Sequence, residues 1–526
     1  MREFSLRFHV FTGLLGREVR VLSGLHFRHE RGTIRQFDAI EIVRSYGTVG
    51  KHARWKRDAG RRRRLLERAN KDGSKAGAGA EIGQPGSRAR CGVVWGSELY
   101  RYNYSPMCCF LSGISSPLHM TISQSLAKII EIMANNTPHL SLCVTTTDFE
   151  KVAKDVLPEK SWVYASSSAA TGLSMRSNLD DWSFINFRPR ILRRVDRMDT
   201  RRSILGHTSQ FPFFVSAMGT LGSSHPGAEP LLVRGATRKG MHTMISTAST
   251  KPLEEIMDAH REEQRLLNNQ SPANLSFQLY VPEDRARAKS LIQRVKAAGY
   301  QSLWVTVDTS TLGKRTADRY LQAQENLNAD QGGSARDIHN ENDFAPAFGG
   351  RQVPGSVDAG LTWEDLKWIS QEWNGPLVLK GIQSVEDVKL AVQHGVQGIL
   401  LSNHGGRQIH SAPSSLMTLL EIRKYYPEAF DKLQVFVDGG LRDGADVLKA
   451  LCLGATAVGV GRPYYYALAA YGAEGVERCT DILAEEVEIT MKMLGVTSLD
   501  QLRPEMINTS RLENEMWRPA FEKSKL

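Results

Sequence analysis

The chain has 526 residues, of which 41% are hydrophobic, so it is long enough for a large core and for more than one compact unit. No apolar run approaches the length of a membrane span, and the sequence therefore predicts a soluble protein. The six cysteines show no repeated metal-type spacing, which favours a reducing compartment and predicts no metal site.

The net charge of +10 is unevenly distributed along the chain. Residues 1–120 contain 22 Lys and Arg against 10 Asp and Glu, a net charge of +12, and the remainder has 45 against 47, a net charge of −2. The basic excess includes Arg61 to Arg64 but no aromatic-interleaved or helix-turn-helix pattern. We expect no nucleic acid partner; binding of this segment to nucleic acid or to an acidic membrane surface is the alternative.

Residues 1–116 show no sustained helical or strand period, and Gly73 to Gly86 is flexible in composition. We expect a basic extension that is disordered or only locally structured. Its arginines suit a mitochondrial presequence, the alternative localisation, but its glutamates do not. A translation start at Met120 or Met133 is a further alternative.

The first ordered element is predicted to be a helix near Asp148–Leu157, because Phe149, Val152 and Val156 share one helical face. A short segment around Tyr164 and an extended run at Phe187–Leu192 follow. We expect one catalytic domain over residues 147–512 and a tail over residues 513–526.

Eight strand-like runs follow, separated by helix-compatible stretches such as Ala286–Ala298 and Val385–Val392. Alternation of this kind predicts an α/β fold, a closed (β/α)8 TIM barrel of parallel strands. The one long connection, Thr316–Gly360, favours a mobile lid or an interface loop. The predicted strands are Phe211–Ser216, His242–Ser246, Leu275–Tyr280, Ser302–Asp308, Pro376–Lys380, Gly398–Ser402, Leu433–Asp438 and Ala457–Gly461.

The sixth strand delivers His404 and Arg407 to the end of the barrel where such folds keep their chemistry. An imidazole can accept a proton near neutrality, and a guanidinium can bind a carboxylate with two hydrogen bonds. Two glycines between them allow close approach of the backbone to a ligand. The pattern indicates a base that acts on a carboxylate-bearing substrate; the alternative is a capping histidine and a surface arginine.

Two glycine-rich loops follow the last two strands, Asp438–Arg442 and Gly459–Pro463. Each offers backbone N–H groups and an arginine, which is typical of a phosphate site, although solvated glycine turns are the alternative. Polar residues also stand at the ends of earlier strands, where they predict a polar ligand such as a flavin: Ser246, Gln278, Tyr280, Thr306, Asp308 and Lys380.

Six motifs together resemble the FMN-dependent α-hydroxy acid oxidase and dehydrogenase family, which includes glycolate oxidase and cytochrome-linked lactate dehydrogenase. The resemblance covers roughly Asp148 to Leu512 and implies FMN as the cofactor. The motifs are Ser402–Gln408, Phe277–Tyr280, Thr306–Asp308, Leu312–Arg315, Leu379–Gly381 and Val437–Gly440.

The resemblance also implies roles for individual residues. His404 would be the base in the oxidation of a 2-hydroxy acid, oriented by Asp308, and Tyr280 would hydrogen-bond the substrate hydroxyl. Arg407 would bind the substrate carboxylate with help from Tyr164, and Arg315 would be the second active-site arginine. The cofactor would be bound by Ser246, Gln278, Thr306, Lys380, Asp438, Gly440, Arg442, Gly461 and Arg462, the last three at its phosphate.

Two features bear on the substrate and the electron acceptor. Gly219 and Ala248 stand where bulkier residues are expected, which favours a longer aliphatic or aromatic substrate. None of the early histidines lies in the His-Pro-Gly-Gly context of the family's haem domain. The terminal Ser524-Lys525-Leu526 is the tripeptide read by the peroxisomal import receptor.

We therefore expect a peroxisomal oxidase that passes electrons to oxygen and forms hydrogen peroxide. Three alternatives remain: a cytochrome- or quinone-linked dehydrogenase, a non-redox barrel isomerase or aldolase, and a binding role for the basic extension. The resemblance also implies a homotetramer.

Overall fold

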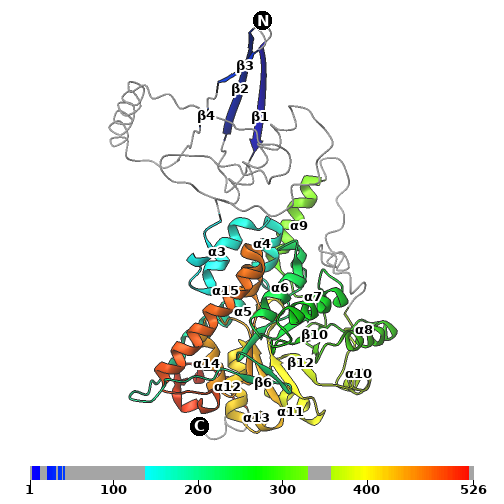
Figure 1. Cartoon of the computed structure of the whole chain (residues 1–526). Coiled ribbons are helices and arrows are strands. Elements are labelled where there is room, and N and C mark those ends of the chain that lie inside the picture. Colours follow the sequence, from blue (N-terminus) through cyan, green and yellow to red (C-terminus); the bar gives the residue numbers. More distant parts are fainter. Residues whose placement is uncertain are drawn as a thin grey trace. The chain divides into compact units, whose positions relative to one another are not determined.

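The computed structural model (Figure 1) describes residues 137–329 and 357–519, together with four strands between residues 3 and 41. The chain divides into two units, Met1–Ser112 and Gly113–Leu526. Among the helices of the described residues, none is long and apolar enough to span a bilayer.

The first unit contains four antiparallel strands, in which β2 pairs with each of the others. These strands were not predicted, although alternate residues of β1 from Phe4 to Val10 are apolar. The rest of the extension, including Arg61 to Arg64, lies outside the described residues. The strands are β1 (Glu3–Phe11), β2 (Arg20–Glu30), β3 (Thr33–Phe37) and β4 (Ile40–Glu41).

The second unit is built on a closed barrel of eight parallel strands, in which each strand pairs with the next and β15 pairs with β8. Each strand falls within a run predicted from the sequence or overlaps it closely, so the predicted barrel is confirmed. The strands are β8 (Phe213–Val215), β9 (Thr243–Ser246), β10 (Leu275–Leu279), β11 (Leu303–Thr306), β12 (Leu377–Ile382), β13 (Gly398–Leu401), β14 (Gln434–Asp438) and β15 (Ala457–Val460).

Helices occupy the connections and surround the strands (Figure 1). Ser384 caps α11 by accepting a hydrogen bond from the Asp387 N–H (3.2 Å). The helices are α6 (Ala228–Arg238), α7 (Leu253–Leu266), α8 (Arg285–Ala298), α10 (Asp365–Trp373), α11 (Val385–Gln393), α12 (Ser415–Tyr425), α13 (Ala429–Lys432), α14 (Gly444–Cys452) and α15 (Arg462–Leu494).

Three helices precede the barrel: α3 (Thr146–Val156), α4 (Glu159–Ser166) and α5 (Leu173–Ser183). The first confirms the predicted helix and packs beside α15. Short pieces complete the domain: β5 (Asn186–Phe187), β16 (Ile507–Asn508), α16 (Ser510–Glu513) and 3-10 helices at Leu140–Leu142, Leu221–Ser223, His404–Gly406, Leu499–Gln501 and Pro504–Met506.

The long connection after β11 begins with a helix, α9 (Thr316–Ala329), and not with a loop. This helix packs beside α4, where Lys160 Nζ lies 2.9 Å from Glu325 Oε2. The expectation of an unpacked segment is wrong for α9, because its Ala, Leu, Gln and Glu residues favour a helix even without an apolar stripe. Residues 330–356 lie outside the described residues.

The amino-terminal end of the barrel is closed by a hairpin of β6 (Arg202–Ile204) and β7 (His207–Ser209). Ile204 and Leu205 pack with the side chains that fill the barrel, among which the rings of Trp304 and Phe436 are 4.9 Å apart. Because this interior is packed with side chains, a ligand has to sit at the opposite, carboxyl-terminal mouth. The other members are Phe214, Met244, Val378, Leu400 and Ala457.

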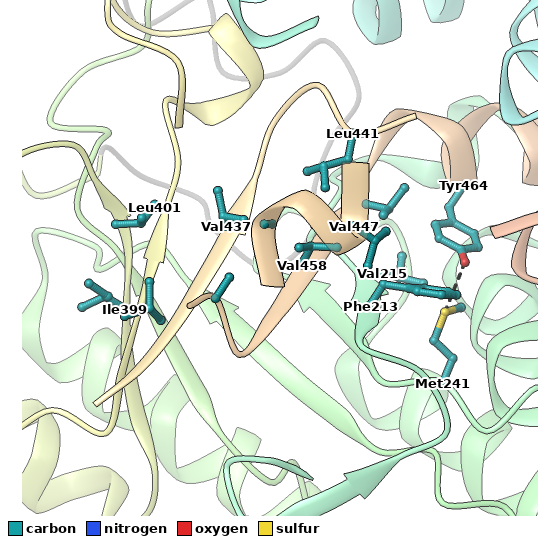
Figure 2. Close-up of a cluster of buried hydrophobic side chains, with 14 of the residues drawn as sticks. Phe213, Val215, Met241, Ile399, Leu401, Val437, Leu441, Val447, Val458 and Tyr464 are labelled. Atoms are coloured by element: carbon teal, nitrogen blue, oxygen red, sulfur yellow. Dashed lines mark hydrogen bonds between the residues drawn. The ribbon is translucent and has the colours of Figure 1, made fainter. Parts of the chain in front are cut away.

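A second core lies between the strands and the helices, part of which Figure 2 shows. Phe213 and Val215 of β8 point outward there, toward Tyr464 of α15. The Tyr464 hydroxyl donates a hydrogen bond to the Met241 sulfur (3.2 Å). The start of α15 is therefore held firmly against the barrel, directly after the end of β15.

Candidate active site

A chain of polar side chains crosses the carboxyl ends of three neighbouring strands. Ser246 of β9 donates to the Gln278 side-chain oxygen (2.9 Å), and the Gln278 amide donates to the Thr306 hydroxyl of β11 (2.8 Å). All three residues are buried. Polar groups are buried only when hydrogen-bonded, so this row is a prepared polar surface at the barrel mouth.

Charged side chains continue this surface along β11, β12 and β14. The Lys380 ammonium lies 3.9 Å from Asp308 Oδ2, and both side chains are almost fully buried. Asp438 is also buried; desolvation raises the pKa of its carboxyl group, against the opposing charge of Lys380. One carboxyl oxygen of each aspartate has no hydrogen-bond partner among the described residues, so both have capacity for a ligand.

His404 lies directly beside Asp308. Its Nδ1 is 2.9 Å from Asp308 Oδ1, and its Nε2 is 3.2 Å from the Tyr280 hydroxyl. A neutral imidazole that donates from Nδ1 to the carboxylate leaves the Nε2 lone pair as a proton acceptor. His404 lies 96 positions from Asp308 and 124 positions from Tyr280 in the sequence, and the barrel brings the three side chains together.

Burial and charge set the protonation states of this pair. Burial raises the pKa of Asp308, but the charges of His404 and Lys380 and two hydrogen bonds outweigh it and hold that pKa below its usual range. Burial lowers the pKa of His404, which Asp308 opposes and Lys380 reinforces, and the net pKa lies below its ordinary value. His404 is therefore neutral, and Asp308 ionised, at neutral pH.

Tyr280 contributes a hydroxyl that stays protonated. Burial raises its pKa, as does the charge of Asp308. Its ring lies nearly parallel to the imidazole of His404, with an interplanar angle of 16°. A protonated phenol next to Nε2 can donate a hydrogen bond to an oxygen bound between the two side chains.

The backbone at His404 is in a left-handed conformation, with φ of 58°, which is unusual for a residue with a Cβ atom. The Asn403 side chain stabilises this turn by accepting a hydrogen bond from the Gly406 N–H (3.0 Å). Asn178 of α5 exchanges two amide hydrogen bonds with Asn403, at 2.7 and 3.0 Å. Asn178 was not predicted, because nothing in its local sequence distinguishes it from a surface asparagine.

Two arginines, Arg407 and Arg315, lie close to one another in this part of the site. Arg407 donates to the backbone oxygens of Tyr164 (2.7 Å) and Ser167 (3.0 Å), and its guanidinium lies 5.0 Å from the centre of the Tyr164 ring. Burial lowers the pKa of Arg407, and the like charge of Arg315 adds to this effect. Arg407 Nη2 and Arg315 Nε have no partner among the described residues, so a carboxylate would satisfy both groups.

The second arginine, Arg315, lies in the connection after β11, directly before α9. Asp318 of α9 lies near the same two arginines. Burial raises the pKa of its carboxyl group above the usual value, although the charges of Arg407 and Arg315 lower it in part. Asp318 was missed because its segment was expected to be a loop. The side chain of Gln408, also missed, connects the turn to the same connection by donating to Asp308 O and Thr311 O, both at 3.0 Å.

The predicted phosphate loops follow β14 and β15. Gly461 directly precedes α15, so this loop ends at the amino-terminal end of a helix, where an anion is favoured. Arg462 donates to the backbone oxygens of Ala165 (2.9 Å), Gly405 (3.1 Å) and Ser167 (2.9 Å). These bonds use three of its five N–H donors, which leaves two for an anion.

Gly440 and Arg442 have different environments in the first of these loops. Gly440 has a φ of +84°, and an added Cβ would lie 1.7 Å from the Asn178 oxygen, so this glycine serves close packing against α5. The Arg442 N–H donates to Asp446 (3.2 Å), and its guanidinium donates to its neighbour Leu441 O (3.1 Å). The terminal tripeptide Ser524-Lys525-Leu526 lies outside the described residues.

Comparison with known proteins agrees with this geometry. Residues 153–509 match the family model described as FMN-dependent dehydrogenase. The chain is 36% identical over 381 residues to an L-lactate dehydrogenase (cytochrome) of Saccharomyces cerevisiae, covering 72% of this chain and 62% of that protein. It is 34% identical over 366 residues to glycolate oxidase 3 of Oryza sativa subsp. indica, covering 69% of this chain and 95% of that protein. The chain thus spans less than two thirds of the cytochrome-linked relatives.

Solved structures give the same result. The recombinant flavin-binding domain of baker's yeast flavocytochrome b2 has a TM-score of 0.64 and 32% identity, over 78% of this chain and 96% of that chain. A mandelate oxidase variant with (S)-mandelic acid has a TM-score of 0.59 and 32% identity, over 69% of this chain and 98% of that chain. The barrel fold is therefore shared with the flavin-binding domain of flavocytochrome b2 and with mandelate oxidase.

Proposed function

Because this chain belongs to the family of FMN-dependent dehydrogenases, we propose that it oxidises an L-2-hydroxy acid to a 2-oxo acid at the mouth of its barrel. The observation that carries the proposal is the pairing of His404 with Asp308 (2.9 Å), close to two arginines that each have an N–H group without a partner among the described residues. A base next to a carboxylate-binding pair suits a substrate that carries a hydroxyl and a carboxylate on neighbouring carbons.

The residues at the barrel mouth fit FMN, the cofactor of the family. The buried row of Ser246, Gln278 and Thr306 offers both donors and acceptors, which the ring of a flavin requires. The start of α15 and the remaining donors of Arg462 suit a phosphate. Lys380 adds positive charge between these two regions. We propose that Asp438, Gly440, Arg442 and Gly461 also contact the cofactor.

When bound, FMN supplies the redox chemistry by accepting two electrons from the substrate. The side chains would do the rest. His404 Nε2 would take a proton from the substrate, and Asp308 would stabilise the imidazolium that forms. Arg407 and Arg315 would hold the carboxylate together with Tyr164, and Tyr280 would donate a hydrogen bond to the substrate oxygen. General-base catalysis by such a group contributes about 10² to 10⁴ in rate.

A longer aliphatic or aromatic side chain on the substrate is supported by Gly219 and Ala248. A Cβ placed on Gly219 would lie 3.0 Å from Ala248 Cβ and 3.3 Å from the Tyr164 hydroxyl oxygen, so a larger side chain at Gly219 would crowd Tyr164, which is proposed to bind the carboxylate. A structural relative, a mandelate oxidase variant, was solved with an aromatic 2-hydroxy acid. We expect kcat/KM to rise along a series from glycolate to longer acids; a maximum at glycolate would contradict this.

Oxygen is the proposed electron acceptor, with hydrogen peroxide as the product. The support is the sequence Ser524-Lys525-Leu526, which suits import into peroxisomes, and the similarity to glycolate oxidases. The similarity to cytochrome-linked L-lactate dehydrogenases supports the alternative, a cytochrome or quinone acceptor. Membership of an FMN-dependent family argues against a non-redox isomerase or aldolase. A homotetramer also remains a proposal.

The deciding experiment measures peroxide formation in air by the purified yellow protein with a panel of L-2-hydroxy acids. We expect peroxide with the wild type and a loss of at least about 10² in the rate with His404→Gln, while FMN absorbance is kept. His410→Gln, an exposed histidine six residues further along, is the control and should retain activity.

The two parts of the proposal fail separately. If substrate bleaches the flavin of the wild type but no peroxide forms, the chemistry stands and the acceptor is wrong. If no 2-hydroxy acid bleaches the flavin, or if His404→Gln retains activity, the proposed function itself is wrong.

A further inference from the structure

A buried carboxylate in the first turn of α6 connects two loops at the barrel mouth. Glu229 is 1% exposed, and its oxygens accept hydrogen bonds from the backbone N–H groups of Leu221 (3.3 Å), Thr250 (2.7 Å) and Lys251 (3.2 Å). The first belongs to the connection after β8, and the other two to the connection after β9.

Two further hydrogen bonds join the same pair of loops. The Thr220 N–H donates to Ala248 O (2.9 Å), and the Gly222 N–H donates to the Thr250 hydroxyl (2.9 Å). Loops at a barrel mouth are usually the mobile part of the fold. Here a buried carboxylate and these two bonds hold one loop against the other.

The loops hold in place the residues expected to face the substrate. Gly219 precedes Thr220, and its Cα lies so close to Ala248 and to the Tyr164 hydroxyl that an added Cβ would be 3.0 and 3.3 Å from them. We call these three residues the Gly219 wall. The distance across the wall depends on the separation of the two loops, which Glu229 and the two other hydrogen bonds hold together.

We propose that Glu229 is a positioning residue for the substrate, because it holds Gly219 and Ala248 at a fixed separation beside Tyr164. The inference rests on the proposed function for the identity of the substrate and goes beyond it in assigning the width of the site to a carboxylate that touches neither substrate nor cofactor. Exchange of the carboxylate for an amide replaces an acceptor with an N–H₂ group, which cannot accept a bond from a backbone N–H.

The first measurement is hydrogen exchange of the holoenzyme, which does not depend on activity. Glu229→Gln should accelerate exchange in both loops, residues 219–224 and 247–252, by about tenfold, the effect of losing one charged hydrogen bond. Glu263→Gln is the control: Glu263 of α7 is also a buried glutamate, but it binds Arg234 and Arg238 in the later turns of α6 and none of the loop N–H groups. It should leave both loops unchanged.

The second measurement separates substrate positioning from general destabilisation. Glu229→Gln should raise KM about tenfold, change kcat less than about threefold and retain FMN. Gly219→Ala should raise KM in the wild type, because the added methyl group meets loops that are held together. In the Glu229→Gln background the loops can separate, so the same substitution should cost less.

Several results would overturn the proposal: unchanged exchange in Glu229→Gln, an equal cost of Gly219→Ala in both backgrounds, or the same KM change in Glu263→Gln. Should Glu229→Gln not fold, Thr250→Val removes the bond to Gly222 and should raise KM in the same direction by a smaller factor; an unchanged KM refutes the proposal. If no 2-hydroxy acid reduces the flavin of the wild type, the proposed function has failed. The hydrogen-exchange data then still test whether Glu229 holds the two loops together.

Discussion

At the scale of single residues, Asp308 has two effects on His404, and both favour proton removal from the substrate. Its charge raises the pKa of the imidazole, which burial lowers, and its hydrogen bond keeps the proton on Nδ1. The first effect makes His404 a stronger base, and the second leaves Nε2 free to act. An uncharged side chain of the same shape would remove both.

Replacing Asp308 with Asn should therefore change the pH profile as well as the rate. Protonated His404 cannot accept a proton, so kcat/KM falls as the pH falls through the His404 pKa, which lies below the ordinary value for histidine. Without the charge that raises it, this pKa moves down, and the acid limb should shift to lower pH. The plateau should fall by about 10² to 10⁴, because the Asn amide favours the other tautomer.

The measurement is kcat/KM against pH for wild type and Asp308→Asn, with FMN content checked in each preparation. Asp481→Asn, which removes an exposed carboxylate that pairs with Lys239, serves as the control and should leave the profile unchanged. An acid limb that stays in place or moves to higher pH would show that Asp308 does not set the pKa of His404.

At the scale of elements, the site depends on α5 packing against the loops that follow β13 and β14. Asn178 of this helix binds Asn403, which shapes the turn at His404, and its backbone oxygen faces Gly440. Trp182 of the same helix donates a hydrogen bond to Gly439 O (3.0 Å). One helix outside the barrel thus supports both the proposed base and a proposed cofactor loop.

Gly440→Ala should destabilise this contact and weaken FMN binding. The alanine would have to adopt a positive φ, and its Cβ would collide with the backbone of α5. We therefore expect the free energy of unfolding to fall by about 2 kcal/mol or more. Gly395→Ala is the matched control, because Gly395 also has a positive φ, +66°, but no atom lies within 4 Å of its added Cβ. It should cost about 1 kcal/mol from the backbone alone.

Chemical denaturation and FMN titration of both variants test this. Equal losses of stability in the two variants would mean that the close packing against Asn178 is unimportant. Unchanged FMN affinity in Gly440→Ala would remove this loop from the proposed cofactor site.

At the scale of the whole molecule, FMN should stabilise the barrel, because the proposed contacts come from strands all around it. A ligand at 1,000 times its Kd adds about 4 kcal/mol to the free energy of unfolding. Removing FMN should therefore lower the Tm by on the order of 10 °C. Riboflavin, which lacks the phosphate, should restore only part of this loss if the start of α15 binds the phosphate.

Thermal unfolding of holoenzyme, apoenzyme and apoenzyme with each flavin measures the effect. The holoenzyme of Gly395→Ala provides a baseline for a small change in stability away from the mouth. Recovery by riboflavin equal to that by FMN would contradict the proposed phosphate site at Gly461 and Arg462.

The sequence by itself determined the barrel and most of the proposed site. Buried parallel strands are continuous apolar runs, so all eight could be recognised one at a time. The strand ends share one mouth in such a barrel, so His404, Asp308, Tyr280 and Lys380 could be placed together without coordinates. The helix α9 was not predicted, because its sequence has no apolar stripe and only the helix propensity of its residues indicates a helix.

Only the tertiary structure decided which residues hold those side chains in place. The pairing of Asn178 with Asn403 and the three bonds of Arg462 to backbone oxygens join segments that are far apart in the sequence. The contact of Glu229 with two different loops is of the same kind. A local pattern reports the periodicity and solvation of its own segment, whereas a hydrogen bond between distant segments depends on how the whole chain packs.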